Sequence, residues 1–152
     1  DEKLNGQQDL VLDAGTYCFN DLEMSGGSSL SGNGMVKVYV TGELKIVGNV
    51  DAGMISELGD PDDPTNLTIV LVPQSGSTPS ATLTGNAILR AAVYAPYSTV
   101  TIGGDSEVYG SIVANRVSAS SHAKIHYDEA LSQLANPIGL YEPRILSWHQ
   151  SE

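Results

Sequence analysis

The chain has 152 residues, which is enough for one domain with its own core, and its formal net charge is −11. A surface with this charge repels phosphate backbones and anionic lipids, so we do not expect nucleic acid as a direct partner. Hydrophobic residues make up 41% of the chain but aromatic residues only 6%, and there are 16 glycines. Many small and β-branched residues with few large rings favour thin, repeated β layers over a wide globular core.

The N-terminal part begins with a strand–turn–strand pattern, DLVLDAGTYCFNDLEM. The only cysteine, Cys18, cannot form an internal disulfide, and its neighbours in GTYCFN predict a buried strand position with an unreactive thiol. The stretch MVKVYV then alternates valine with other residues. This period of two predicts a strand with Val36, Val38 and Val40 on one face.

The polar stretch of residues 51–66, DAGMISELGDPDDPTN, interrupts the β pattern. We predict a loop extruded from one corner of the fold, followed by the strand LTIVLV. Asp60, Asp62 and Asp63 lie together in this loop, and such a density of oxygen ligands can hold Ca²⁺. Their spacing matches no EF-hand, and the two prolines among them equally suit a plain solvated loop. These three aspartates are therefore a candidate calcium site, and we predict no other cofactor.

The second half of the chain contains an internal repeat of 17 to 19 residues. TLTGNAILRAAVYAP aligns with TIGGDSEVYGSIVAN and then with SASSHAKIHYDEAL. The aligned positions are Asn86, Asp105 and His122 at a Gly-Asn-like corner, Leu89, Val108 and Ile125 in an apolar slot, and Arg90, Tyr109 and His126 in the slot beyond it. We assign Asn33 and Asn49 to the same corner in two earlier units.

A unit of this length is too short to bury its own apolar face, whereas stacked copies, about 4.8 Å apart, bury it between them. We therefore predict an all-β fold, a single-stranded β-solenoid (β-helix) of about five short rungs over residues 15–127, with right-handed winding. The whole chain, residues 1–152, is predicted to be one domain. Residues 128–152 are predicted to cap its end, with a short helix that starts at Asp128 and a tail that carries Trp148.

The stretch AKIHYDEAL holds side chains of the kinds found in catalytic sites. His126 and Asp128 are two residues apart, so on a strand they share a face and form a candidate acid–base dyad. The alternative is that His126 ends the last strand and Asp128 begins the cap. Asp105 and Glu107 are the nearest approach to a paired carboxylate on one rung. We favour the structural interpretation of both pairs and predict no catalytic residues.

Two segments resemble a domain of exported bacterial proteins. GTYCFNDLEMSGGSSLSGNGMVKVYVTGELKIVGN is similar to its first half, and VYAPYSTVTIGGDSEVYGSIVANRVSASSHAKIHYDEAL to its second, together covering about Gly15 to Leu131. The resemblance is to β-helical domains of type IV pilus assembly or minor-pilin-like proteins, and it implies a β-helical domain on a pilus or cell envelope. Full-length forms of that family carry an N-terminal helix that this chain lacks. The chain starts at Asp1 without a methionine, so we expect a mature or trimmed fragment.

These observations predict a non-catalytic structural or adhesive module outside the bacterial cell, at its surface, in association with a type IV pilus or a related filament. Its expected partners are proteins of that filament or a surface ligand such as a glycan. No apolar run is long enough to span a membrane, so we expect membrane contact only through a segment missing from this chain. The alternative is a β-helix that binds or cleaves carbohydrate.

Overall fold

The computed structural model describes residues 1–54, 63–129 and 131. The elements that lie wholly within these residues are eleven β-strands and one 3₁₀-helix. The strands are β1 (Glu2–Leu4), β2 (Asp9–Phe19), β3 (Leu22–Gly26), β4 (Ser29–Val40), β5 (Glu43–Gly48), β6 (Asp51–Ala52), β7 (Leu67–Leu71), β8 (Ser80–Gly85), β9 (Ile88–Ile102), β10 (Glu107–Ala119) and β11 (Lys124–Tyr127), and the helix η1 (Pro64–Asn66) precedes β7. Within these ranges, no helix has the length and apolar character that crossing a membrane requires.

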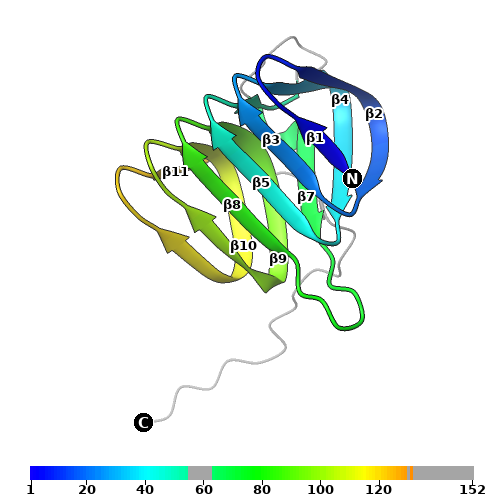
Figure 1. Cartoon of the computed structure of the whole chain (residues 1–152), viewed down its shortest axis with the longest axis vertical. Helices are drawn as coiled ribbons and strands as arrows, with labels where there is room; N and C mark the ends of the chain where they lie inside the picture. Colours follow the sequence, from blue (N-terminus) through cyan, green and yellow to red (C-terminus); the bar gives the residue numbers. More distant parts are fainter. Residues whose placement is uncertain (55–62, 130, 132–152) are drawn as a thin grey trace.

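All pairings between these strands are parallel and join one turn of the chain to the next. They form three faces. Face A contains β1, β3, β5, β8 and the ends of β9 and β10; face B contains the first parts of β2, β4, β9 and β10 with β6 and β11; face C contains the remaining parts of β2, β4, β9 and β10 with β7. In Figure 1 the strands β1, β3, β5 and β8 of face A lie side by side across the front. The protein is an all-β β-solenoid, as predicted, and it has about six turns where about five were expected. Its handedness stays a prediction.

The core consists of columns of apolar side chains that point inward from successive turns. Val36, Val38 and Val40 are all buried, which confirms the predicted alternation on β4. Leu89, Val108 and Ile125 are in register on β9, β10 and β11, as the repeat predicts. The columns are buried in the middle of the stack because each side chain has a neighbour in the turn on either side.

The corner between faces A and B is built by one column of residues with left-handed backbone angles. In each of the six turns one residue at this corner has a positive φ: Gly6, Gly26, Gly48, Gly85, Gly104 and Ser121, with φ of 70°, 74°, 95°, 92°, 70° and 61°. A Cβ on Gly85 would lie 2.7 Å from the backbone nitrogen of Gly48, so the turns approach too closely for a side chain. Glycine is therefore required twice, by the angle and by the space.

Ser121 is the exception in this column, and it stands in the last described turn. It is exposed, and no described turn packs on its far side. The backbone there has room to shift, which allows a side chain at a left-handed position.

Three boundaries differ from the sequence-based prediction. The stack starts at Glu2, because β1 pairs with β3, and not near Gly15. Asp51 and Ala52, expected in the loop of residues 51–66, form β6 and pair with β4 and β9. The predicted cap at residues 128–152 lies outside the described residues except for 128, 129 and 131, where the Leu131 N–H donates to the Asp128 carbonyl at 3.2 Å.

Two residue assignments were wrong. Asn33 is not at the glycine corner, because it pairs with Asp13 between β4 and β2, where the chain passes from face B to face C. Gly27, next to Gly26, takes the place corresponding to Asn49. Cys18 is exposed and not buried. On β2 the two neighbours of Cys18 occupy inward positions, opposite valines of β4. The strand alternation therefore turns the Cys18 side chain outward.

We predict that Leu89→Ala lowers the free energy of unfolding by about 2–5 kcal/mol, because it leaves a cavity between turns. Ile125→Ala, in the same column, should cost about 1 kcal/mol or less, because Ile125 is 45% exposed while Leu89 is 0% exposed. Urea denaturation of both variants measures the difference. Equal losses would contradict an inward column that is open at its last strand.

We predict that Gly85→Ala destabilises the protein by at least about 2 kcal/mol, through backbone strain and overlap with Gly48 together. The matched control is Gly76→Ala, because Gly76 also has a positive φ, of 84°, but no atom lies within 4 Å of the place that a Cβ would occupy there. The control carries strain alone and should cost about 1 kcal/mol. Thermal and urea unfolding measure both, and a loss for Gly85→Ala no larger than for Gly76→Ala would show that close packing of turns does not restrict this corner.

Candidate functional site

The candidate site is a row of polar side chains on the outer side of face B, in the last four described turns. On each strand of this face, the residues directly before and after the inward one point outward. We call the following set the polar ladder: Asp51, Arg90, Glu107, Tyr109, Lys124 and His126. The parallel register holds these side chains close together, so each contacts a side chain of a neighbouring turn.

Glu107 on β10 is the centre of the polar ladder. Its Oε1 accepts a hydrogen bond from Lys124 Nζ at 2.6 Å, and its Oε2 accepts one from the Tyr109 hydroxyl, also at 2.6 Å. His126 Nε2 lies 3.5 Å from Oε2. The bond from Lys124 and then that from Tyr109 lower the pKa of Glu107 from 4.5 to about 2. The same two bonds raise the pKa of Lys124 and of Tyr109.

Aromatic and cationic groups extend the ladder in both directions. The rings of Tyr109 and His126 are stacked, with their centroids 4.5 Å apart and their planes at 11°. On the other side of Tyr109, the Arg90 guanidinium carbon lies 6.0 Å from the ring centroid, and Arg90 forms an ion pair with Asp51 of β6. The ladder therefore connects four successive strands of face B through side chains alone.

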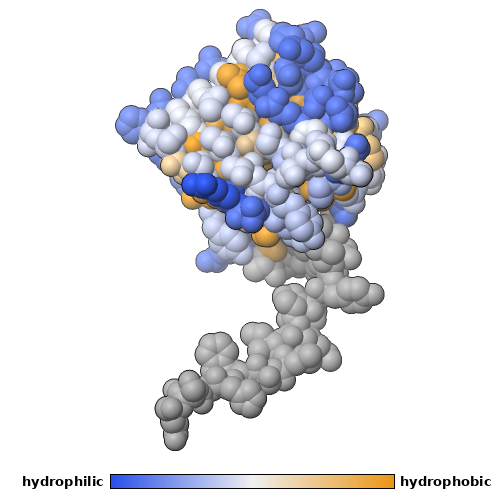
Figure 2. Space-filling model, turned by 60° about the horizontal axis from the view of Figure 1, so that its bottom comes forward, coloured by the Kyte–Doolittle hydropathy of each residue, from blue (hydrophilic) through white to orange (hydrophobic). Residues whose placement is uncertain are grey.

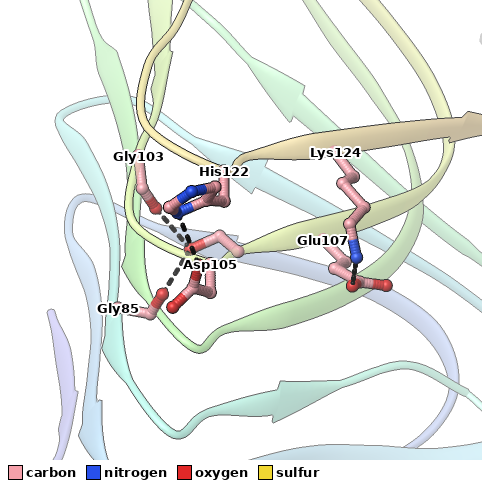
Figure 3. A network of polar contacts seen from close by, with 7 residues as sticks. Gly85, Gly103, Asp105, Glu107, His122 and Lys124 are labelled. Atoms are coloured by element: carbon pink, nitrogen blue, oxygen red, sulfur yellow. Dashed lines mark hydrogen bonds and ion pairs between the residues drawn. The ribbon is translucent and has the colours of Figure 1, made fainter.

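A second polar contact lies at the glycine corner, as Figure 3 shows. His122 Nδ1 is 3.2 Å from Asp105 Oδ1, and both side chains are more than half exposed. Beneath them the buried Ser106 hydroxyl donates to the Gly103 carbonyl at 2.8 Å. The figure also shows Lys124 directly above Glu107, so Asp105 and Glu107 each bind a cation-forming group of the next turn.

The structure gives Asp105 and Glu107, one of the candidate catalytic pairs, different contacts. Asp105 contacts His122, whereas Glu107 contacts Lys124, so the two carboxylates of this rung have different partners. His126 stacks on Tyr109 and faces Glu107, and Asp128 lies beyond the end of β11. A carboxylate that donates a proton at neutral pH needs a raised pKa, and Glu107 has the opposite shift. The ladder suits cross-bracing between turns.

The candidate calcium site falls mostly outside the described residues. Asp60 and Asp62 are not among them. Asp63 is described and serves as the N-cap of η1, where its Oδ1 accepts from the Thr65 N–H at 2.9 Å and its Oδ2 from the Asn66 side-chain amide at 3.2 Å. The described part of the chain holds no group of three or more His, Cys, Asp or Glu side chains able to bind a metal ion.

Sequence reasoning placed Arg90, Tyr109 and His126 in one slot but did not recognise it as a stack. The signal was present, since identical slots in adjacent parallel strands put side chains about 4.8 Å apart. Two rings and a guanidinium in such positions stack without any change of backbone. The partner Lys124 follows in the same way from the column of Glu107, whereas Tyr109 lies two residues along the same strand.

The fold and the stacked ladders define this chain as a β-solenoid protein. A family model described as a domain of unknown function (DUF7305) matches residues 25–134, which is well over half of the chain. The chain belongs to this family. No curated protein and no solved structure gives a significant match.

We predict that wild type has a higher free energy of unfolding than Glu107→Gln, and that this difference depends on pH. The pKa of Glu107 is lowered on folding, so its contribution is fully present above about pH 5 and is lost as the pH falls through about 4.5 towards 2. Urea unfolding of both proteins at several pH values measures this difference.

The control for this prediction is the Lys124→Gln background. Lys124 supplies the largest part of the shift, so Glu107→Gln should there produce a smaller pH-dependent difference. A difference that does not depend on pH in wild type, or one of the same size in both backgrounds, would contradict the assigned contacts.

Proposed function

We propose that this domain is a non-catalytic structural or adhesive module, located outside the bacterial cell and associated with a type IV pilus or a related surface filament. The observation that carries the proposal is the cross-turn pairing of the polar ladder. The residues closest to acid–base chemistry hold adjacent turns together through charge-assisted bonds. Side chains used in this way support a rigid rod that presents its surface.

The composition of the outer surface also supports this role. On the face shown in Figure 2, hydrophobic residues form small separate groups among hydrophilic ones. The net charge of −11 favours a well-solvated surface. The similarity of two long segments to pilus-associated β-helical domains gives the proposed location.

The alternative function is carbohydrate binding or cleavage. Two tyrosines favour binding over cleavage, because Tyr97 and Tyr127 are 67% and 63% exposed and an exposed ring can stack on a sugar. They lie at different places in the fold, Tyr97 within β9 and Tyr127 at the end of β11.

We predict that, in the bacterium that encodes it, the chain is recovered with surface filaments sheared from intact cells. Immunoblots of the sheared, membrane and cytoplasmic fractions measure this. Digestion of the chain by a protease added to intact cells is an independent check of its exposure, with a cytoplasmic protein as the control that should remain intact. Retention in the cytoplasmic fraction would contradict the proposed location.

A separate experiment distinguishes the non-catalytic role from the alternative. The purified chain is incubated with a panel of polysaccharides, and reducing ends and unsaturated products are measured. We expect no release. Sugar release that is abolished by Asp105→Asn or Glu107→Gln would overturn the non-catalytic role, and saturable binding without release that is lost in Tyr127→Ala would favour a glycan-binding module.

A further inference from the structure

The two ends of the described stack are open strand edges. On face B, β2 pairs only with β4 at one end, and β11 pairs only with β10 at the other, among the described residues. Among the described residues no strand pairs with the outer edge of either, and such an edge is a template for another strand. Because all pairs are parallel, the two edges are different, and a contact between them joins one end of a molecule to the opposite end of the next.

On faces A and B, the first and last members of each column are the residues that would meet if a second copy continued the stack. On the outside of face B these are Asp9 and Lys124, which belong to one column through successive register pairs. The two side chains have opposite charges. The Lys124 ammonium, which binds Glu107 in its own chain, would be sandwiched between two carboxylates.

One inward column of face B is also matched. Leu10 and Ile125 begin and end it, and both are apolar with Ile125 45% exposed. Joining two copies in register would cover these two side chains with apolar neighbours, as every internal turn does. On face C the described stack ends one turn earlier, with Ile112 on β10, so Tyr17 of the next copy would not meet Ile112 directly.

Face A carries one mismatch. Its first inward position is Glu2, in the column of Leu22, and its last is Val117, which is 42% exposed. An inward-pointing charge on an edge strand is a device that opposes edge-to-edge pairing. Placing the Glu2 carboxylate on Val117 would cost desolvation, so association of the ends is weakened but not prevented.

We propose that the domain self-associates head to tail, with β2 of one copy seated on β11 of the next in the register of the internal turns, and that Glu2 limits the strength of this contact. The partner is thus a second copy of this chain. Self-association rests on the proposed structural role, but the two proposals can fail separately. Filament recovery tests location in cells, whereas the experiment below uses only the purified full chain.

Sedimentation velocity of the full chain over a wide concentration range tests the proposal. Wild type should show weak, concentration-dependent association. Glu2→Leu should lower the dissociation constant by about tenfold, because it replaces the inward charge by an apolar group. Asp9→Lys and Lys124→Glu should each raise the constant by about tenfold, and the two together should restore it, since they exchange the charges across the joint.

The matched control is Glu43→Lys, which changes the net charge as Asp9→Lys does but lies on β5 in the middle of the stack, and it should leave association unchanged. Circular dichroism checks that each variant folds. If Lys124→Glu does not fold, Asp9→Lys alone still tests the contact between the two charges. If wild type and Glu2→Leu both remain monomeric at about 1 mM, the proposal is overturned. Association that charge reversal at Asp9 does not change would also overturn it.

Discussion

The hydrogen bonds at the glycine corner fix the geometry of the whole domain. In five successive steps, the N–H that follows the left-handed residue donates to the carbonyl of the left-handed residue one turn earlier, at N–O distances of 2.6 to 3.0 Å. This contact brings the backbones together at a point where no side chain fits. Once it is repeated, every other position of the turn acquires a fixed counterpart in its neighbours. The core columns and the polar ladder are both consequences of that register.

The same register gives opposite results inside and outside the solenoid. Inside, identical positions collect apolar side chains, and their burial provides the favourable free energy of folding. Outside, identical positions would bring like charges together, which is destabilising. The outward column of face B avoids this where Glu107 meets Lys124, and the corner does so where Asp105 meets His122. In these two places the carboxylate of one turn meets a cation-forming group of the next.

Much of the fold could be predicted from the sequence because the repeat and the alternation are local signals. The slots of Leu89, Val108 and Ile125 were aligned correctly without knowledge of the turns between them. Asn33 was misplaced because Gly-Asn also occurs where the chain passes from face B to face C, and a dipeptide does not say which corner it builds. Cys18 was misplaced because a one-residue error in strand parity exchanges inside and outside. The partners of Glu107 depend on the register between turns, which becomes definite only when the length of each turn is known.

The third turn of the solenoid is longer than the others, since Gly48 and Gly85 are in register although 37 residues separate them. One of the additional segments contains a small loop whose neck is closed by two hydrogen bonds between Gln74 and Ser77. The strands on either side of it keep the same pairing as those in the shorter turns. The length of one turn can therefore change without a change in the strand register between neighbouring turns. A solenoid of this kind can acquire new surface features by insertion at one corner while its scaffold stays unchanged, which makes the loop of residues 73–79 a natural point for grafting a foreign peptide.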